Sequence, residues 1–191
     1  MINNWVRIKS GYGPSVEEIY KDRIGSYAKF YKMDPLSRLG FVASELLLDA
    51  EGSRDREWGE TRGVVLMNAT SSLADDRNYQ RTIVGDDAFP SPSLFVYTLP
   101  NVVTGEIAIR NRYYGETNFF VLPGADPEQM SKVIEMSFCD DKLQSLLTGW
   151  IDCEDEEHYD ALMFIANRTV CGRRAELAEE IAALFEKEIK Y

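Results

Sequence analysis

The chain has 191 residues, of which 45% are hydrophobic and 12% aromatic, and its formal net charge at pH 7 is −11. This composition predicts a folded domain with a core rather than a disordered chain. The acidic balance argues against nucleic acid as a partner, because phosphates require a basic surface. The sequence has no apolar run long enough for membrane insertion, and its first residues do not form a secretion signal.

The N-terminal part predicts a strand, a long helix and a second strand. Residues 5–10 alternate between apolar and polar side chains, which favours a strand. Residues 33–50 form an apolar stripe at helical spacing, with Asp34 as the N-cap and Pro35 at the first helical position. Residues 63–69 are a compact apolar run, typical of a strand that is buried on both faces.

The middle of the chain predicts two helices and a further strand. Residues 70–84 begin with Thr and Ser, which cap helices. Residues 93–112 are helical in pattern, with an interruption or kink at Pro100. Residues 117–122 form an apolar strand after a glycine. Surface loops are expected at residues 51–62 and 86–92.

The C-terminal part opens with a strong helix start, in which Asp126 is the cap, Pro127 takes the first position and Gln129 follows three residues after the cap. Strands are expected at residues 144–152 and 161–166. Residues 173–190 form an amphipathic helix. Its apolar stripe consists of Leu177, Ile181, Leu184, Phe185 and Ile189.

This alternation of strands and helices predicts a layered α/β fold, with helices on a mostly parallel sheet of about five strands. We expect residues 1–170 to form one α/β domain. Residues 171–191 are expected to add a C-terminal amphipathic helix that packs on this domain or on a partner.

One segment carries a family resemblance. Residues 89–121 read FPSPSLFVYTLPNVVTGEIAIRNRYYGETNFFV, and the order of their elements resembles the centre of a β-ketoacyl synthase of the thiolase superfamily. KMDPLSRLGFVASELLLDA, GVVLMNATSS and LLTGWIDC resemble other pieces of its N-terminal half, in the family's order. The resemblance implies a thiolase-like half fold. It is closest to the short ketosynthase-like proteins found alongside aryl-polyene or flexirubin-type pigment synthesis.

The resemblance also implies a catalytic cysteine that this chain lacks. In the family, the strand before the nucleophile ends at a cysteine on a helix N-terminus, which activates the thiol. Here the vestigial nucleophile position falls near Gly124, and Asp126 adds a negative charge that would raise a thiol's pKa. The chain also stops before the family's C-terminal half, and His158 matches no family motif. We therefore predict no catalytic residue, no metal and no cofactor.

The three cysteines are expected to be inert reduced thiols, which favours a cytoplasmic location. Cys139 lies at the far end of a predicted helix, Cys153 precedes an acidic run, and Cys171 lies in a late turn. His158 is predicted to be a surface residue beside an acidic loop.

The resemblance further implies a pocket and a pairing strand. Phe95, Leu99, Asn101, Phe120 and Leu122 are the pocket candidates. In the family, the strand before the nucleophile pairs with its counterpart across a dimer, so a homodimer or a heterodimer with a catalytic ketosynthase is expected. The dimer-strand candidates are Thr117, Asn118, Phe119, Phe120 and Val121.

Three hypotheses follow for function. The first is a non-condensing accessory protein in a fatty-acid-like, aryl-polyene or polyketide pathway, which binds a ketosynthase or an acyl carrier protein. For an acidic carrier, Arg110, Arg112, Arg173 and Arg174 would have to form a basic patch, and the alternative is that they are separate surface charges. The second is 3-oxoacyl-carrier synthase or acyltransferase activity that another chain completes. The third is a structural α/β protein with only remote ancestry to the family.

Overall fold

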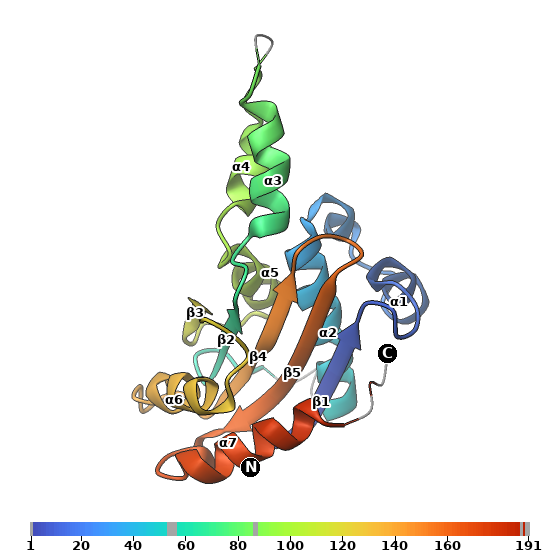
Figure 1. Cartoon of the computed structure of the whole chain (residues 1–191). Helices are drawn as coiled ribbons and strands as arrows, with labels where there is room; N and C mark the ends of the chain where they lie inside the picture. Colours follow the sequence, from blue (N-terminus) through green and yellow to red (C-terminus); the bar gives the residue numbers. More distant parts are fainter. Residues whose placement is uncertain (1, 53–56, 86–87, 188, 190–191) are drawn as a thin grey trace.

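The computed structural model describes residues 2–52, 57–85, 88–187 and 189. Within these ranges one sheet carries helices on both of its faces (Figure 1). The strands are β1 (Ile2–Lys9), β2 (Arg62–Asn68), β3 (Thr117–Val121), β4 (Ser145–Cys153) and β5 (Tyr159–Asn167). The helices are α1 (Val16–Arg23), α2 (Pro35–Glu51), α3 (Leu73–Thr82), α4 (Pro92–Tyr97), α5 (Val102–Asn111), α6 (Pro127–Ser137) and α7 (Arg174–Phe185), with 3₁₀ turns η1 (Ala28–Lys32) and η2 (Arg168–Val170).

The sheet has five strands in the order β1-β5-β4-β2-β3. This confirms the layered α/β class and the strand number. The sheet is mixed rather than mostly parallel: β2 runs parallel to β3 and β4, whereas β5 runs antiparallel to β1 and β4. The reason is local, because β4 and β5 are joined by a tight turn over residues 154–158, and a short connection permits only antiparallel neighbours.

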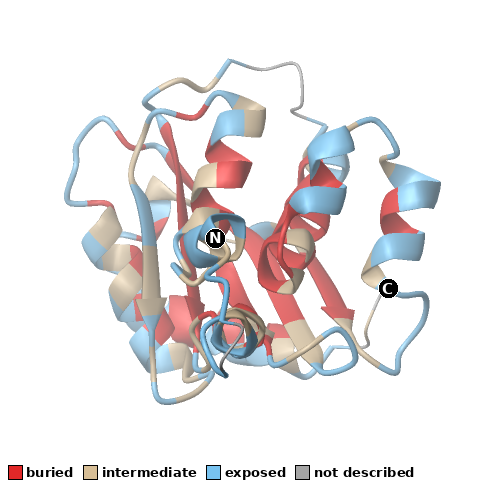
Figure 2. Ribbon diagram, turned by 90° about the horizontal axis from the view of Figure 1, so that it is seen from above, coloured by how far each residue is buried: buried red, intermediate tan, exposed pale blue. Residues whose placement is uncertain are grey.

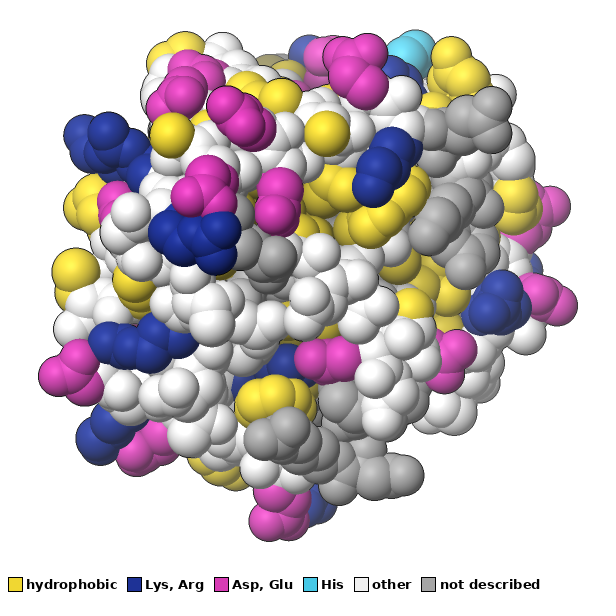
Figure 3. All heavy atoms as spheres, turned by 90° about the horizontal axis from the view of Figure 1, so that it is seen from below, with side chains coloured by type: hydrophobic (Ala, Val, Ile, Leu, Met, Phe, Trp, Pro, Cys, Tyr) yellow, Lys and Arg dark blue, Asp and Glu magenta, His cyan; other side chains and the backbone are white. Residues whose placement is uncertain are grey.

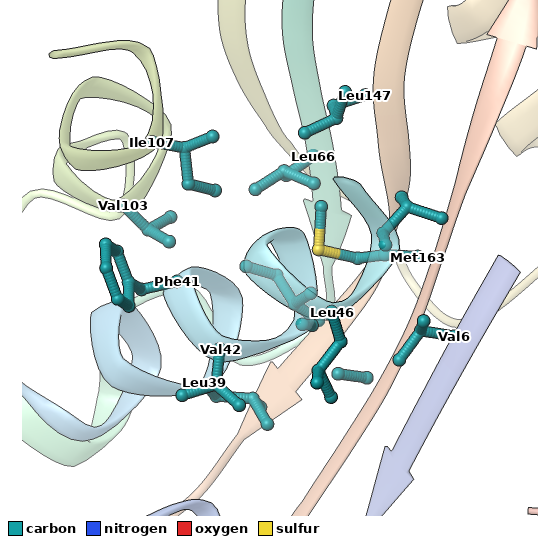
Figure 4. Close-up of a cluster of buried hydrophobic side chains, with 14 of the residues drawn as sticks. Val6, Leu39, Phe41, Val42, Leu46, Leu66, Val103, Ile107, Leu147 and Met163 are labelled. Carbon is teal, nitrogen blue, oxygen red and sulfur yellow. The ribbon is translucent and has the colours of Figure 1, made fainter. Parts of the chain in front are cut away.

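Two apolar layers sandwich the sheet. On one face, α2 and α5 pack against it, and side chains such as Leu39, Val42 and Leu46 of α2 meet Leu66 and Met163 of the strands (Figure 4). On the other face, α6 and α7 cover a second cluster. Viewed from above, the strands are buried between helices whose outer sides are exposed (Figure 2). The second cluster includes Val65, Met67, Met130, Ile134, Leu177 and Ile181.

The predicted helix starts are confirmed where a cap is encoded locally. The Asp34 carboxylate accepts hydrogen bonds from the backbone N–H groups of Leu36 and Ser37, at 3.1 and 3.2 Å, and Pro35 begins α2. One helix, α1, was not predicted. Its signal is a capping box, in which Ser15 and Glu18 each bond to the other's backbone N–H.

The structure gives the bounds of two predicted helical segments. The segment over residues 93–112, predicted with an interruption or kink at Pro100, is two helices, α4 and α5, because Pro100 lies in the turn that separates them. The helix predicted over residues 173–190 ends at Phe185, and Ile189 lies beyond it. Residues 53–56 and 86–87 of the two predicted loops, and residues 188 and 190 of that last helix, lie outside the described residues.

The terminal helix α7 packs on α6, and its buried Leu177 and Ile181 belong to the second core cluster. The division of the chain at residue 170 stays a prediction. None of the helices in the described ranges combines the length and the apolar character needed to cross a membrane.

Candidate functional site

The strand, turn and helix that the family uses for its nucleophile are all present. After β3, the Leu122 N–H donates to the Asn68 carbonyl at 2.8 Å, and α6 begins with Asp126 as its N-cap. The Asp126 carboxylate accepts from the Gln129 amide at 2.8 Å and from the Glu128 N–H at 2.9 Å, and these bonds lower its pKa below the ordinary value. Gln129 thus bonds to the carboxylate of the cap, whereas a capping box would bring it to the backbone.

Gly124 occupies the turn between β3 and α6. No atom lies within 4 Å of the place where a Cβ of this residue would stand, so the turn has room for a side chain. Glycine nevertheless supplies no nucleophilic atom, and the ionised Asp126 two residues later disfavours a neighbouring anion. The strand, turn and helix that the resemblance predicts are therefore present, and the assignment of Gly124 to the nucleophile position stays a prediction.

The cysteines do not replace the missing nucleophile. Cys153 is 2% exposed, and its Sγ donates to the Asp155 carbonyl oxygen at 3.3 Å. Burial, followed by the nearby acids Asp34 and Asp155, raises the pKa of its thiol to about 12. It lines a cavity of about 210 Å³ with Arg38 and Tyr159, but the thiol stays protonated at neutral pH.

A thiol-labelling prediction follows. Cys139 and Cys171 are free and exposed, whereas Cys153 is buried with a raised pKa. With iodoacetamide at neutral pH, we expect mass spectrometry to find Cys139 and Cys171 modified and Cys153 protected, because the thiolate is the reacting form. In denaturant all three should react equally. Rapid modification of Cys153 in the folded chain would contradict its assignment as an inert thiol.

His158 lies on the exposed turn between β4 and β5, as predicted. Its Nδ1 is 2.8 Å from the Asp155 carboxylate, and this hydrogen bond raises the pKa of the imidazole. The His158 side chain is 70% exposed, which fits a surface residue rather than a catalytic base. Its hydrogen-bond partner is Asp155, which belongs to the same turn.

The strand β3 forms an open edge of the sheet. In the described part of the chain it pairs only with β2. The bond from Leu122 to Asn68 fixes its orientation: backbone groups of successive strand residues alternate in direction, so even-numbered residues face β2. The N–H groups of Thr117, Phe119 and Val121 therefore point to the open edge. The Phe119 N–H donates to the Asn118 side-chain oxygen at 3.2 Å, whereas those of Thr117 and Val121 are available to another strand.

The helices α3 and α4 form an arm that projects beyond the end of the sheet (Figure 1). The arm is held together by a bond from the Ser72 hydroxyl to the Thr98 carbonyl at 2.6 Å and by the rings of Tyr79 and Phe95, 5.5 Å apart. The helix α4 buries none of its residues despite its apolar sequence PSLFVY. Large hydrophobic side chains are exposed along the arm and just after it: Ile83, Val84, Phe89, Phe95, Val96 and Leu99.

The five predicted pocket residues divide between two places. Phe95 and Leu99 are exposed on and after α4, and Asn101 is exposed just before α5. Phe120 and Leu122 are partly buried against the cluster under α6 and α7. None of the cavities described here has these residues in its wall, so a shared pocket stays a prediction.

The four arginines considered as a basic patch do not form one. Arg110 ends α5 on one face of the sheet, 3.7 Å from Glu45, and Arg173 pairs with Glu176 at α7 on the other face. On the face seen from below, acidic and basic side chains are interspersed (Figure 3). These arginines are therefore separate charges.

The amino-acid sequence matches no protein-family model and no curated protein. Solved structures are similar in fold. The ishigamide ketosynthase/chain length factor aligns with a TM-score of 0.65 at 18% identity, over 89% of this chain and 62% of that chain. A chain from the complex of a ketosynthase with its chain length factor from Xenorhabdus doucetiae aligns with a TM-score of 0.61 at 14% identity, over 95% of this chain and 90% of that chain.

A third structure is a type II PKS acyl-carrier protein in complex with its ketosynthase bound to the hexaketide. It aligns with a TM-score of 0.61 at 12% identity, over 91% of this chain and 64% of that chain. The protein thus spans less than two thirds of the first and third matched chains and nearly all of the second. At these identities the likeness establishes the fold, and the ketosynthase-like, thiolase-like fold predicted from the sequence is confirmed.

Proposed function

We propose that this ketosynthase-like chain is a non-condensing accessory protein that pairs with a catalytic ketosynthase in a fatty-acid-like, aryl-polyene or polyketide pathway. The observation that carries the proposal is the strand β3, the turn and the helix α6, with Gly124 in the turn where the family resemblance predicts the nucleophile. A condensing enzyme needs a thiolate there, and the one buried thiol, Cys153, has a pKa of about 12. In this proposal the scaffold lacks the thiolate for condensation and acts by binding the catalytic ketosynthase.

Two surfaces favour a protein partner. The edge of β3 offers unpaired backbone donors, and a strand of another chain can add to it. Phe95 and Val96 of α4, and Leu99 just after this helix, are each about half exposed. Exposed hydrophobic residues gathered on one element mark interaction sites. The likeness to a chain of similar length from a two-protein ketosynthase complex supports the same assembly here.

In this proposal the protein acts in the cytoplasm, with its cysteines reduced, and uses no cofactor. The ketosynthase supplies the thiol and the oxyanion hole. An acyl carrier protein would dock mainly on that subunit, because the arginines of this chain do not form a basic patch. The pocket candidates Phe95 and Leu99 would then complete a cavity that is shared with the partner.

Affinity purification of the tagged chain from its native host, followed by mass spectrometry, tests the pairing. Recovery of a full-length ketosynthase at equal stoichiometry is the expected result. The purified complex should load an acyl group on the ketosynthase's cysteine and none on this chain. Recovery of the chain alone as a homodimer, or acyl loading of Cys153, would contradict the proposal.

A backbone variant tests the pairing surface. Val121→Pro removes a donor that points away from β2, and an edge strand tolerates proline at such a position. We expect it to weaken ketosynthase binding by about tenfold or more. Val121→Thr keeps the N–H and the branched side chain, so it should bind normally. Equal binding by both variants, measured by biolayer interferometry, would exclude the edge of β3 from the interface.

A further inference from the structure

A cavity of about 210 Å³ lies where the α3–α4 arm meets the body of the protein. Its wall comes from the residues before and within the first turn of α2, from α3, from α4 and from the turn between β4 and β5. The charged and titratable side chains in this wall are Lys32, Asp34, Arg38, Asp75, Tyr97 and Glu156.

Asp75 is the unusual member of this set. It lies in the first turn of α3 and is 2% exposed, yet its Oδ2 has no hydrogen-bond partner among the described residues. Buried carboxylate oxygens in folded proteins almost always accept a hydrogen bond. The Oδ2 of Asp75 therefore leaves a place in the cavity wall for a donor from outside the chain.

The charges around Asp75 favour a cation as that donor. Burial raises the pKa of Asp75 to about 6, and the negative charges of Asp34 and Asp76 act in the same direction. The basic side chains of the wall do not neutralise it. Arg38 donates to the Tyr31 carbonyl at 3.1 Å and lies 3.7 Å from the Glu156 carboxylate, and neither Arg38 nor Lys32 forms an ion pair with Asp75 among the described residues. The wall therefore presents more negative than positive charge to an incoming group.

The cavity adjoins the exposed apolar face of the arm. Leu94 and Tyr97 of α4 line it, and Phe95 and Val96 of the same helix are exposed beside them. A chain that covers the apolar residues of α4 therefore also reaches the mouth of the cavity. This arrangement, an apolar contact area with a pocket that takes one polar anchor, is typical of the energetic centre of a protein interface.

We propose that this cavity receives a basic side chain, arginine or lysine, from the ketosynthase that covers α4. The inference rests on the proposed pairing and specifies its chemistry. The guanidinium or ammonium group donates to the Asp75 Oδ2, which has no donor among the described residues. The contact makes α3, and not only the edge of β3, part of the recognition surface.

The test compares two carboxylates that are adjacent on one helix. Asp75→Asn removes the buried charge, whereas Asp76→Asn removes the same charge from an exposed position. In the purified complex we expect Asp75→Asn to weaken binding by about thirty-fold or more, because one side of a buried charge pair is lost. Asp76→Asn should change the affinity by no more than about twofold. Thermal unfolding confirms that each variant is folded.

Two further measurements identify the contact. Wild-type affinity should fall as the pH drops through about 6, where Asp75 takes up a proton, and Asp75→Asn should lack this fall. Alanine scanning of the partner's basic residues should find one whose loss is coupled to Asp75→Asn and additive with Asp76→Asn. A complex that forms normally with Asp75→Asn would overturn this inference and leave the pairing intact. Failure of the wild-type chain to form any complex would overturn both.

Discussion

Replacing Gly149 with alanine is expected to be the most destabilising single change in this chain. Gly149 lies in the middle of β4 with φ at +150°, and a Cβ there would stand 2.0 Å from the Leu162 carbonyl oxygen and 2.8 Å from the Met163 Cα. Both are backbone atoms of β5, so the overlap is relieved only when the central strands separate. We expect a loss of at least about 3 kcal/mol, a large part of the total stability of a typical domain.

Gly124→Ala is the matched control for Gly149→Ala. No atom lies within 4 Å of the added Cβ at Gly124, so its cost should stay within about 1 kcal/mol. Urea unfolding followed by circular dichroism measures both variants. A Gly149→Ala chain with wild-type stability would show that β4 and β5 are not packed as described.

Replacing Arg62 with alanine is expected to be the second most damaging change. The Arg62 side chain is fully buried, and its two terminal nitrogens each donate to the Glu51 carboxylate at 2.6 Å. Its Nε donates to the Ser145 hydroxyl at 3.1 Å, and the guanidinium stacks on the Trp58 ring at 3.5 Å. Removing one partner from a buried pair leaves the other charge uncompensated, which costs about 3–5 kcal/mol.

A surface ion pair supplies the comparison for Arg62→Ala. Lys142 bonds to Glu60 at 2.9 Å, but both side chains are more than 60% exposed. Solvent screens such a pair, so Lys142→Ala should cost no more than about 1 kcal/mol. Similar losses for Arg62→Ala and Lys142→Ala in chemical denaturation would refute the structural role of the buried arginine. Because Arg62 joins the end of α2 to β2 and β4, its loss should also loosen the edge on which the partner is proposed to bind.

Local chemistry explains why much of the fold was predictable. Caps and prolines are short-range signals: Asp34 with Pro35 and Asp126 with Pro127 fix two helix starts without help from the rest of the chain. Apolar runs of strand length also sufficed to locate β2 and β4. The prediction that Gly124 stands at the family's nucleophile position rests on the family resemblance, and it remains a prediction.

Whether neighbouring strands run parallel or antiparallel was harder to predict from the sequence. Each strand was predicted from its own residues, but the antiparallel pairing of β5 depends on which neighbours it meets. Strand direction is a relation between distant segments, and here it turns on a five-residue connection over residues 154–158. For residues 93–112 the sequence predicted an interruption or a kink at Pro100, and the structure shows the interruption between α4 and α5; propensity alone does not say whether a proline bends or ends a helix.

The sequence by itself determined the layered α/β class and the main helix starts, because each depends on residue type and local order. Only the tertiary structure decided that β3 is an open edge, that α4 leaves its apolar residues exposed and that the Oδ2 of the buried Asp75 has no donor among the described residues. An apolar residue predicts burial, and an aspartate predicts exposure. At α4 and Asp75 the packing of distant segments reverses both expectations, and these are the positions where a partner is proposed to bind.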